Sequence, residues 1–255
     1  MKLIKWEELP QEMQSEAVRK YYDILAKRKG SLILKRVFDI VCSLILLVIL
    51  SPVFLILAIA IKIDSPGPVF YRQERVTQYG RHFRIHKFRT MVQFADKGSQ
   101  VTVNNDNRVT RVGRFIRKCR LDEIAQLFDT ISGTLTLVGV RPESPRFVAE
   151  YTDEMMATLL LPAGVTSLAS IYYKDEAKLL DGAEETDKVY IEKILPGKMY
   201  YNLKGIEQFS FWGDMRIMFM TVFAVLGKEY QADEKGEAEF AEKMQSDTKK
   251  EELQV

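Results

Sequence analysis

Two neighbouring acids, Asp122 and Glu123, lie in the stretch RKCRLDEIAQLFD, directly after the bases Arg117, Lys118 and Arg120. Adjacent residues on a helix point about 100° apart, so the two carboxylates cannot superimpose as one pair. We therefore expect different roles, one acid to attack and one to hold a metal or a proton. Nearby cations would lower the pKa values that two close anions raise, and would keep a nucleophilic carboxylate ionised. The alternative is that the pair only stabilises a helix dipole.

The motifs around the acid pair favour chemistry over helix stabilisation. The run DNRVTRVGRFIRK leads into the pair and LVGVRPESP follows it, both rich in charge and punctuated by glycine or proline. Arg141 precedes Pro142, which biases its backbone to an extended form and would hold the guanidinium rigidly over a site. For Glu143, an assisting role and a structural role are equally open.

The basic middle of the chain is typical of a polar β-hairpin. In DSPGPVFYRQERVTQYGRHFRIHKFRTM, turn residues open the segment and two strand-like runs flank residues 78–80. Period-two alternation places Lys87 and Arg89 on the same face of the second run. Several cations that converge on one point suit a phosphate or a diphosphate. The alternative for each residue taken singly is a solvated or lipid-facing basic face.

Two further interpretations of this basic segment are weaker. Basic residues interleaved with aromatic ones also occur in nucleic-acid-binding proteins, but the membrane segment described next argues against such a partner. His82 and His86 have no cysteine or carboxylate partner at a spacing typical of metal sites. We therefore interpret both histidines as ordinary polar residues.

The longest apolar run, IVCSLILLVILSPVFLILAIAI, lies between Asp39 and Lys62. As a straight helix it would extend roughly 30 Å, enough to cross the apolar part of a bilayer. Ser51 and Pro52 lie in its middle, where proline removes a backbone donor and favours a bend. The Ser51 hydroxyl could satisfy the carbonyl that the proline frees. The sequence thus predicts a helix-break-helix element.

The charges around this run predict its topology. Bases lie on both sides of it, namely Lys27, Arg28, Lys29, Lys35 and Arg36 before it and Lys62, Arg72, Arg75, Arg81 and Arg84 after it. A helix that crosses the membrane should leave one flank poor in lysine and arginine. We therefore expect residues 31–64 to form a re-entrant hairpin that dips into one leaflet and returns. A plain transmembrane span is the main alternative, and a soluble core helix is a distant third.

The remaining segments complete the expected organisation. Residues 1–30 carry apolar residues at four-residue spacing, which predicts an amphipathic helix that lies on the membrane or packs on the globular part. Residues 65–228 are the expected cytoplasmic catalytic domain, and residues 229–255 a charged tail, solvated or disordered. The expected fold class is α+β, predominantly α: a monotopic membrane hairpin and a helical domain with a short β-hairpin.

Composition excludes several classes of protein. With 255 residues, of which 47% are hydrophobic, the chain is neither collagen-like nor disordered throughout. Its two cysteines, Cys42 and Cys119, provide no disulfide framework and fit a reducing, cytoplasm-facing location. We expect no cleavable signal peptide, because the apolar run begins late and follows a charged helical segment.

Five motifs in order closely resemble the bacterial sugar transferase family, the monotopic polyprenyl-phosphate phosphoglycosyl transferases: KRVFD, SPGPVFYRQERV, HKFRTM, DNRVTRVGRFIRKCRLDEIAQLF and LVGVRPESP. The resemblance runs from about Lys35 to Leu226 and resumes, after a divergent stretch, in FSFWGDMRIMFMTVFAVL, which contains Asp214. The family has a re-entrant membrane helix broken at Ser-Pro, which matches Ser51-Pro52. Its larger members add further modules, so the resemblance implies the small form.

The resemblance implies an Mg²⁺-dependent enzyme on the cytoplasmic face of the bacterial inner membrane. It would transfer a sugar-1-phosphate from a UDP-sugar to a membrane polyprenyl phosphate and release UMP, as the first membrane step of surface glycan assembly. Asp122 would be the nucleophile that forms an aspartyl-phosphosugar, and Glu123 its acidic partner, with both expected to bind Mg²⁺. The expected phosphate-binding residues are Lys87, Arg89, Arg117 and Arg141. Membrane lipids are further expected partners, and the oligomeric state, a homodimer included, stays open.

Departures from the family pattern limit this inference. Many relatives show a Pro-Gly-Ile-Thr-Gly-like turn where this chain has LPAGVTSLASIYY, with Ser167 in place of the second glycine. We expect residues 174–199 to select the sugar, whose identity the sequence does not give. One rival hypothesis is a non-catalytic scaffold that binds anionic lipid and recruits glycan-assembly proteins. The other is one-step transfer, with the acids serving only as metal ligands.

Overall fold

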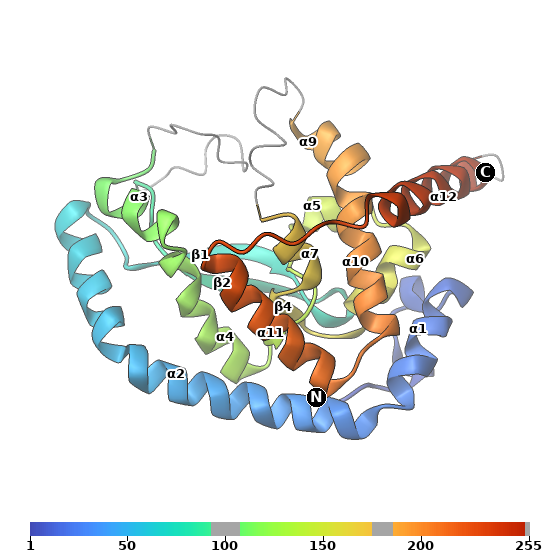
Figure 1. The fold of residues 1–255 in the computed structure, drawn as a ribbon, viewed down its shortest axis with the longest axis horizontal. Coiled ribbons are helices and arrows are strands. Elements are labelled where there is room, and N and C mark those ends of the chain that lie inside the picture. Colours follow the sequence, from blue (N-terminus) through green and yellow to red (C-terminus); the bar gives the residue numbers. More distant parts are fainter. Residues whose placement is uncertain (93–107, 175–185, 253–255) are drawn as a thin grey trace.

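The chain is built mainly of helices, as the sequence predicts, and its two small sheets lie among them (Figure 1). The structure, a computed structural model, describes residues 1–92, 108–174 and 186–252. Its α-helices are α1 (Glu16–Ala26), α2 (Lys29–Asp64), α3 (Arg111–Lys118), α4 (Gln126–Ser132), α5 (Pro145–Val148), α6 (Asp153–Met156), α7 (Leu168–Tyr172), α9 (Thr186–Val189), α10 (Leu195–Glu207), α11 (Phe211–Val225) and α12 (Glu234–Glu252). The strands are β1 (Phe70–Val76), β2 (His82–Phe88), β3 (Leu135–Val138) and β4 (Ala163–Thr166).

Helix α2 carries the apolar run and forms one edge of the molecule, where its ribbon bends along its length (Figure 1). Pro52 lies inside this one continuous helix. The Ser51 hydroxyl donates to the carbonyl of Val48 at 2.8 Å, which is the acceptor that the proline leaves unpaired. The predicted role of Ser51 is therefore confirmed. The predicted break is wrong in one respect: the hydroxyl replaces the lost donor, so the chain bends without leaving the helix.

The outer face of α2 is not covered by protein. Among the described residues, α2 is the one helix long and apolar enough to cross a membrane, and only 11% of its most apolar window is buried. Val48, Ile49 and Ile63 are 75%, 64% and 82% exposed. A core helix of a soluble protein would be covered, so the third alternative does not fit this helix.

A group of charged side chains, here called the brace, fastens the start of α2 to the rest of the chain. Lys35 pairs with Asp214 of α11 at 2.7 Å. Asp39 accepts a hydrogen bond from the hydroxyl of Thr136 in β3 at 2.6 Å. Arg36 donates to two carbonyl oxygens at the end of α4, at 2.6 and 2.8 Å. The brace therefore consists of Lys35, Arg36, Asp39, Thr136 and Asp214.

The predicted β-hairpin is confirmed, and the structure contains a second two-stranded sheet. Strands β1 and β2 pair antiparallel, with Tyr71 opposite Lys87. Strands β3 and β4 pair in parallel, and the sequence analysis did not anticipate them. Past the end of β3, the backbones of Gly139 and Gly164 approach so closely that a Cβ on Gly164 would lie 2.1 Å from the Gly139 nitrogen. Only glycine permits this approach, which sets the path of the chain toward Arg141.

The two ends of the chain pack on the globular part. Tyr21 and Leu25 of α1 are buried in a core cluster, so the packed alternative for this amphipathic helix is confirmed. The predicted charged tail contains α12, which packs against α10. There Glu237 accepts a hydrogen bond from the Tyr201 hydroxyl at 2.6 Å, and Met244 is 7% exposed. The first part of this tail is therefore a docked helix and not a freely solvated one.

Candidate active site

The acid pair lies at a sharp change of chain direction. Arg120 adopts the left-handed conformation, with φ of 53°, and ends the helical path of α3. The chain then continues as a 3₁₀-helix, η5 (Leu121–Ala125), which leads directly into α4. A non-glycine residue with positive φ is uncommon and costs conformational energy. The backbone is thus held in an unfavourable form immediately before Asp122 and Glu123.

The 3₁₀ turn changes which apolar residues of this segment are buried. The spacing of Leu121, Ile124, Leu127 and Phe128 is typical of one amphipathic helix packed by all four. Leu127 is 7% exposed, as expected, but Phe128 is 40% exposed. A 3₁₀-helix has about 3.0 residues per turn where an α-helix has 3.6, so the stripe rotates along the segment. Phe128 instead packs its ring edge against Phe54 of α2, at 5.6 Å between ring centroids.

Glu123 is held by two cations. The guanidinium of Arg141 pairs with its carboxylate through both terminal nitrogens, the longer contact being 3.4 Å. The ammonium of Lys87 lies 3.5 Å from the same carboxylate. Burial alone would raise the pKa of Glu123, but Arg141 and then Lys87 outweigh it and hold the pKa well below its usual range. Glu123 is therefore an ionised and anchored carboxylate.

Asp122 differs from its neighbour. Within the described part of the chain, no other residue donates a hydrogen bond to its carboxylate. Burial and then the charge of Glu123 raise its pKa, while Lys87 and Arg117 act in the opposite direction. The prediction that the cations lower the pKa of the acid pair therefore holds for Glu123 and is wrong for Asp122, where burial outweighs them. A carboxylate with a raised pKa and free lone pairs is a better nucleophile than one held in an ion pair. The two acids thus have different surroundings, as expected for different roles.

Three of the four predicted phosphate-binding cations surround the acid pair. Lys87 and Arg141 contact Glu123 directly. Arg117 comes from α3, and its Nε donates to the hydroxyl of Thr90 at 2.9 Å. Burial lowers the pKa of Lys87, and the charge of Glu123 acts against this effect. The elements that place these cations are β2, α3 and the chain that follows β3.

Arg89 does not join this group, which corrects the prediction that it faces the same ligand as Lys87. Strand β2 ends at Phe88, so period-two alternation does not extend to Arg89. Arg89 is 6% exposed, and its guanidinium donates to the carbonyls of Ser65 and Pro66, at 2.7 Å each. Arg89 therefore anchors the turn at the end of α2.

Arg75 is a site residue that the sequence analysis missed. It lies four residue pairs along the hairpin from Lys87 and on the same face, because Tyr71 pairs with Lys87 and Arg75 with Phe83. Burial lowers its pKa, the charge of Glu143 acts against this effect, and the charge of Arg141 adds to it. Period-two alternation, applied to the first strand as well as the second, would have found it.

Glu143 has contacts that favour the structural role left open by the sequence. Its carboxylate accepts hydrogen bonds from Lys198 at 2.7 Å and from the Tyr190 hydroxyl at 2.6 Å. Burial would raise its pKa, but Lys198 and Tyr190 outweigh burial and lower it. Both partners come from the segment predicted to select the sugar, of which residues 175–185 lie outside the described residues.

The acid pair fits one mode of Mg²⁺ binding. The described residues contain no group of three or more His, Cys, Asp or Glu side chains that could hold a metal ion. Mg²⁺ is commonly held by one or two carboxylates together with substrate phosphates and water, a mode that needs no such group. Because the Glu123 carboxylate is engaged by Arg141, Asp122 has more free lone pairs for this purpose.

Comparisons with known proteins agree with the motifs. A family model described as bacterial sugar transferase matches residues 30–228. The chain is 37% identical over 197 residues to a UDP-N-acetylgalactosamine-undecaprenyl-phosphate N-acetylgalactosaminephosphotransferase of Aeromonas hydrophila, covering 76% of this chain and 44% of the relative. It is 34% identical over 199 residues to a UDP-glucose:undecaprenyl-phosphate glucose-1-phosphate transferase of Klebsiella pneumoniae, covering 76% and 40%.

A shorter relative matches a different share of the two chains. A putative undecaprenyl-phosphate N-acetylgalactosaminyl 1-phosphate transferase of Bacillus subtilis is 42% identical over 135 residues, which cover 52% of this chain and 75% of the relative. The chain thus spans less than half the length of the Aeromonas and Klebsiella relatives. The matched region contains the acid pair and all the cations around it.

Proposed function

This chain belongs to the bacterial sugar transferase family, and we propose that it transfers a sugar-1-phosphate from a UDP-sugar to a membrane polyprenyl phosphate, releasing UMP. The observation that carries the proposal is the contrast within the acid pair. Among the described residues, no other residue donates a hydrogen bond to the Asp122 carboxylate, while Glu123 beside it is anchored by Arg141 and Lys87. This is the arrangement that a nucleophile and a fixed acidic partner require.

The transfer proceeds as two displacements at phosphorus. An Asp122 carboxylate oxygen attacks the phosphorus that bears the sugar, the bond to the UMP oxygen breaks, and UMP leaves with the electron pair. A phosphate oxygen of the polyprenyl phosphate then attacks the same phosphorus and releases the Asp122 carboxylate. No proton has to move in either step. The soluble donor and the membrane acceptor thereby use one site in turn.

The cations of the site have a definite task in this reaction. An anionic nucleophile that approaches a diphosphate is repelled, and the departing UMP carries further negative charge. Lys87, Arg117 and Arg141 neutralise this charge, and their positions around the acid pair allow contact with the donor phosphates. Mg²⁺, held by Asp122 and assisted by Glu123, would supply further charge neutralisation at the diphosphate.

The proposed location is the cytoplasmic face of the inner membrane, with α2 re-entrant. Both ends of α2 are fastened to the same globular part. The brace holds its start, and near its end Asp64 accepts a hydrogen bond from the Val112 nitrogen at 3.0 Å. A helix with both ends bound to one domain cannot place them on opposite sides of a membrane. This supports a helix that enters one leaflet and returns through its bend.

Cysteine labelling tests this topology. A Pro66→Cys variant, made after replacement of Cys42 and Cys119, would report which side of a sealed vesicle the chain reaches after α2. We expect labelling from the cytoplasmic side only. Labelling from the periplasmic side would show a plain transmembrane span.

The activity is tested with a panel of UDP-sugars, scored by UMP release on membranes that contain polyprenyl phosphate. UDP-N-acetylgalactosamine and UDP-glucose both belong in the panel, because relatives named for each match this chain at similar identity. Intact-mass measurement of protein mixed with donor alone should detect a sugar-phosphate adduct on the wild type. UMP release without such an adduct would favour one-step transfer, and absence of release with every donor would favour the scaffold.

A further inference from the structure

We propose that His86 and Asp129 form a clamp that positions Lys87 against the acid pair. Neither residue is assigned a role by the motifs or by the relatives. The inference deepens the proposed function and rests on it, because it assumes that Lys87 acts on substrate phosphates beside Asp122 and Glu123.

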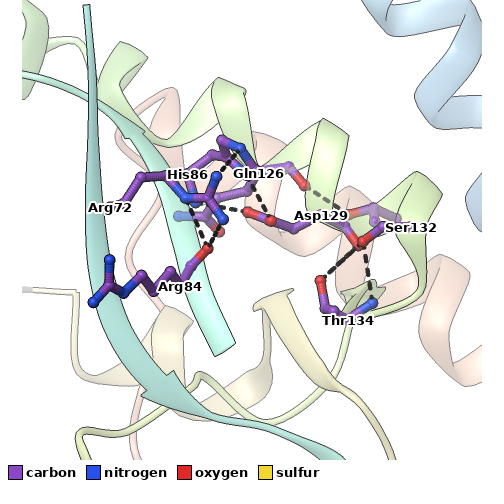
Figure 2. A network of polar contacts seen from close by, with 8 residues as sticks. Arg72, Arg84, His86, Gln126, Asp129, Ser132 and Thr134 are labelled. Carbon is purple, nitrogen blue, oxygen red and sulfur yellow. Dashed lines mark hydrogen bonds and ion pairs between the residues drawn. The ribbon is translucent and has the colours of Figure 1, made fainter. Parts of the chain in front are cut away.

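The clamp consists of two hydrogen bonds to one carboxylate. Asp129, in α4, accepts the backbone N–H of His86 with one oxygen at 2.8 Å and the ring Nδ1–H with the other at 2.7 Å. Figure 2 shows the Asp129 carboxylate directed at His86 from the helix opposite the strand. Asp129 is 4% exposed. A buried carboxylate that binds both the backbone and the ring of one residue restricts the strand as well as the side chain.

The clamp lies next to the site on both of its elements. On β2, Lys87 follows His86, and its side chain points to the opposite face, where it lies 3.5 Å from the Glu123 carboxylate. On the other element, Asp129 belongs to α4, which continues directly from η5, the 3₁₀-helix that carries Asp122 and Glu123. Strand β2 is therefore joined to the helical segment by two neighbouring contacts, Lys87 with Glu123 and His86 with Asp129. The clamp is the second contact, and it fixes the distance between the strand and the helix beside Lys87.

The ring of His86 is fixed on its other side as well. Arg72 of β1 places a terminal nitrogen 2.7 Å from the ring Nε2 and donates twice to the carbonyl of Arg84, at 3.0 and 2.6 Å (Figure 2). Since guanidinium only donates, Nε2 accepts and the ring carries its proton on Nδ1. Phe70 and Phe128 flank the ring, with centroids 6.1 and 6.0 Å away. Both ring nitrogens and the backbone nitrogen are thus engaged.

The hairpin contains a second pair of the same kind, which provides a matched control. The Nδ1 of His82 lies 2.9 Å from the Glu74 carboxylate, so the two pairs use the same atoms at similar distances. The control pair joins β2 to β1 of the same hairpin, and its side chains are 56% and 59% exposed. It does not reach η5 or α4. Its loss should leave the position of Lys87 unchanged.

The first test compares the two pairs in the full-length protein. Asp129→Asn and His86→Gln should each lower kcat/KM for UMP release by about 10- to 100-fold, because small misplacements of a reacting group have effects of this size. Glu74→Gln and His82→Gln should change it by less than about twofold. Activities are measured well below the melting temperature of each variant. An active wild type whose Asp129→Asn and His86→Gln variants keep full activity would overturn the clamp while leaving the proposed function intact.

A double-mutant cycle separates positioning from mere support of the fold. If the clamp acts through Lys87, Asp129→Asn should have little further effect on kcat/KM in a Lys87→Met background. A full additional loss in that background would overturn the inference. This comparison remains valid where Asp129→Asn also reduces stability, because the fold is weakened equally in both backgrounds.

Nitrogen NMR gives a readout that does not depend on activity. The chain has two histidines, so ¹⁵N-histidine labelling yields signals from His82 and His86 alone. In the wild type we expect the Nδ1–H of His86 to be protected from exchange with solvent, because its acceptor Asp129 is 4% exposed, whereas the exposed His82 pair gives no such protection. This protected signal is the signature of the clamp; it should be lost in Asp129→Ala but not in Glu74→Gln, and its retention in Asp129→Ala would contradict the clamp. A wild type with the signature but no UMP release with any donor would overturn the proposed function, and with it the catalytic meaning of the clamp.

Discussion

The brace and the acid site are two charged clusters that look alike in sequence and differ in how completely their charges are paired. In the brace, Lys35 is 3% exposed and its ammonium contacts both the Asp214 carboxylate at 2.7 Å and the Val138 carbonyl at 2.6 Å. In the acid site, Lys87 lies 3.5 Å from the Glu123 carboxylate. Among the described residues, none apart from Asp122 itself donates a hydrogen bond to the Asp122 carboxylate. Closely paired buried charges hold elements together, whereas charges with free hydrogen-bonding capacity can act on a ligand.

This difference suggests how the long apolar helix α2 supports the proposed active site. The brace fixes the start of α2, and Arg89 anchors the turn at its end. Between these points the helix bends at Pro52 without losing its hydrogen-bond ladder. The brace and Arg89 therefore hold α2 in place, and the charges of the acid site remain available to bind substrate.

The largest expected effect is on the free carboxylate. Asp122→Asn should lower UMP release by about 10⁴-fold or more, which corresponds to about 5.5 kcal/mol of transition-state stabilisation. The mass adduct with donor should disappear as well. Stability should not fall, because burial of this charge is unfavourable, as its raised pKa indicates. Undiminished product formation would remove the distinction between the two clusters.

Substitutions in the brace should lower the stability of the fold and not act directly on the reaction. Lys35→Met leaves Asp214 buried without its partner and should lower the free energy of unfolding by about 3 to 5 kcal/mol. Denaturant unfolding in detergent measures it. The exposed pair Lys20 and Glu207 is the control, and Lys20→Met should cost less than about 1 kcal/mol. Similar losses for both lysines would contradict the assignment of the brace.

Two arginines predicted to share one task should separate. Arg141→Met should reduce kcat/KM by about 100-fold, or about 2.7 kcal/mol, because it frees Glu123 and removes a phosphate contact. Arg89→Met should leave kcat/KM within about threefold and instead lower the melting temperature, since its donors bind carbonyls at the end of α2. A large loss of kcat/KM in Arg89→Met, with little change in Arg141→Met, would show that Arg89 and not Arg141 acts on the substrate.

Glu143 lies near the acid site but is paired with Lys198 and Tyr190. It therefore tests whether a paired charge stabilises the fold even where it lies close to the site. Its folded-state pKa is lowered because Lys198 and Tyr190 outweigh burial. Its stabilising effect is therefore fully present above its ordinary pKa, near 4.5, and is lost as pH falls toward the folded-state value. Glu143→Gln should cost about 2 kcal/mol at neutral pH, and its difference from wild type should shrink on acidification. A constant difference across pH would contradict this role.

The smallest expected effect is at the bend of α2. Ser51→Ala leaves the Val48 carbonyl without the hydroxyl donor and should cost about 1 kcal/mol of stability. Ser43 is the matched control in the same helix, because its buried hydroxyl has no partner in the described structure. Ser43→Ala should therefore have little effect on the melting temperature. Equal losses at the two serines would show that the hydroxyl does not support the bend.

Local sequence patterns were sufficient to predict several features of this protein. The apolar run predicted a long helical element, and the whole run lies within α2 (Lys29–Asp64). Turn residues and period-two alternation predicted the hairpin. The ordered motifs identified the family, because residues that act on one ligand recur at recognisable spacings. These signals are short in range, so a single chain contains them completely.

Other features depended on contacts between distant segments. The role of Arg89 followed from where β2 ends, and the exposure of Phe128 from the 3₁₀ turn before α4. The docking of α12 and the partners of Glu143 and His86 join residues tens of positions apart.

The sequence by itself therefore determined which residues carry the charge and where the long apolar helix lies. Only the tertiary structure decided which charges are paired and which remain free. The physical reason is that period and propensity act over a few residues, whereas the pairing of a buried charge depends on every element packed around it.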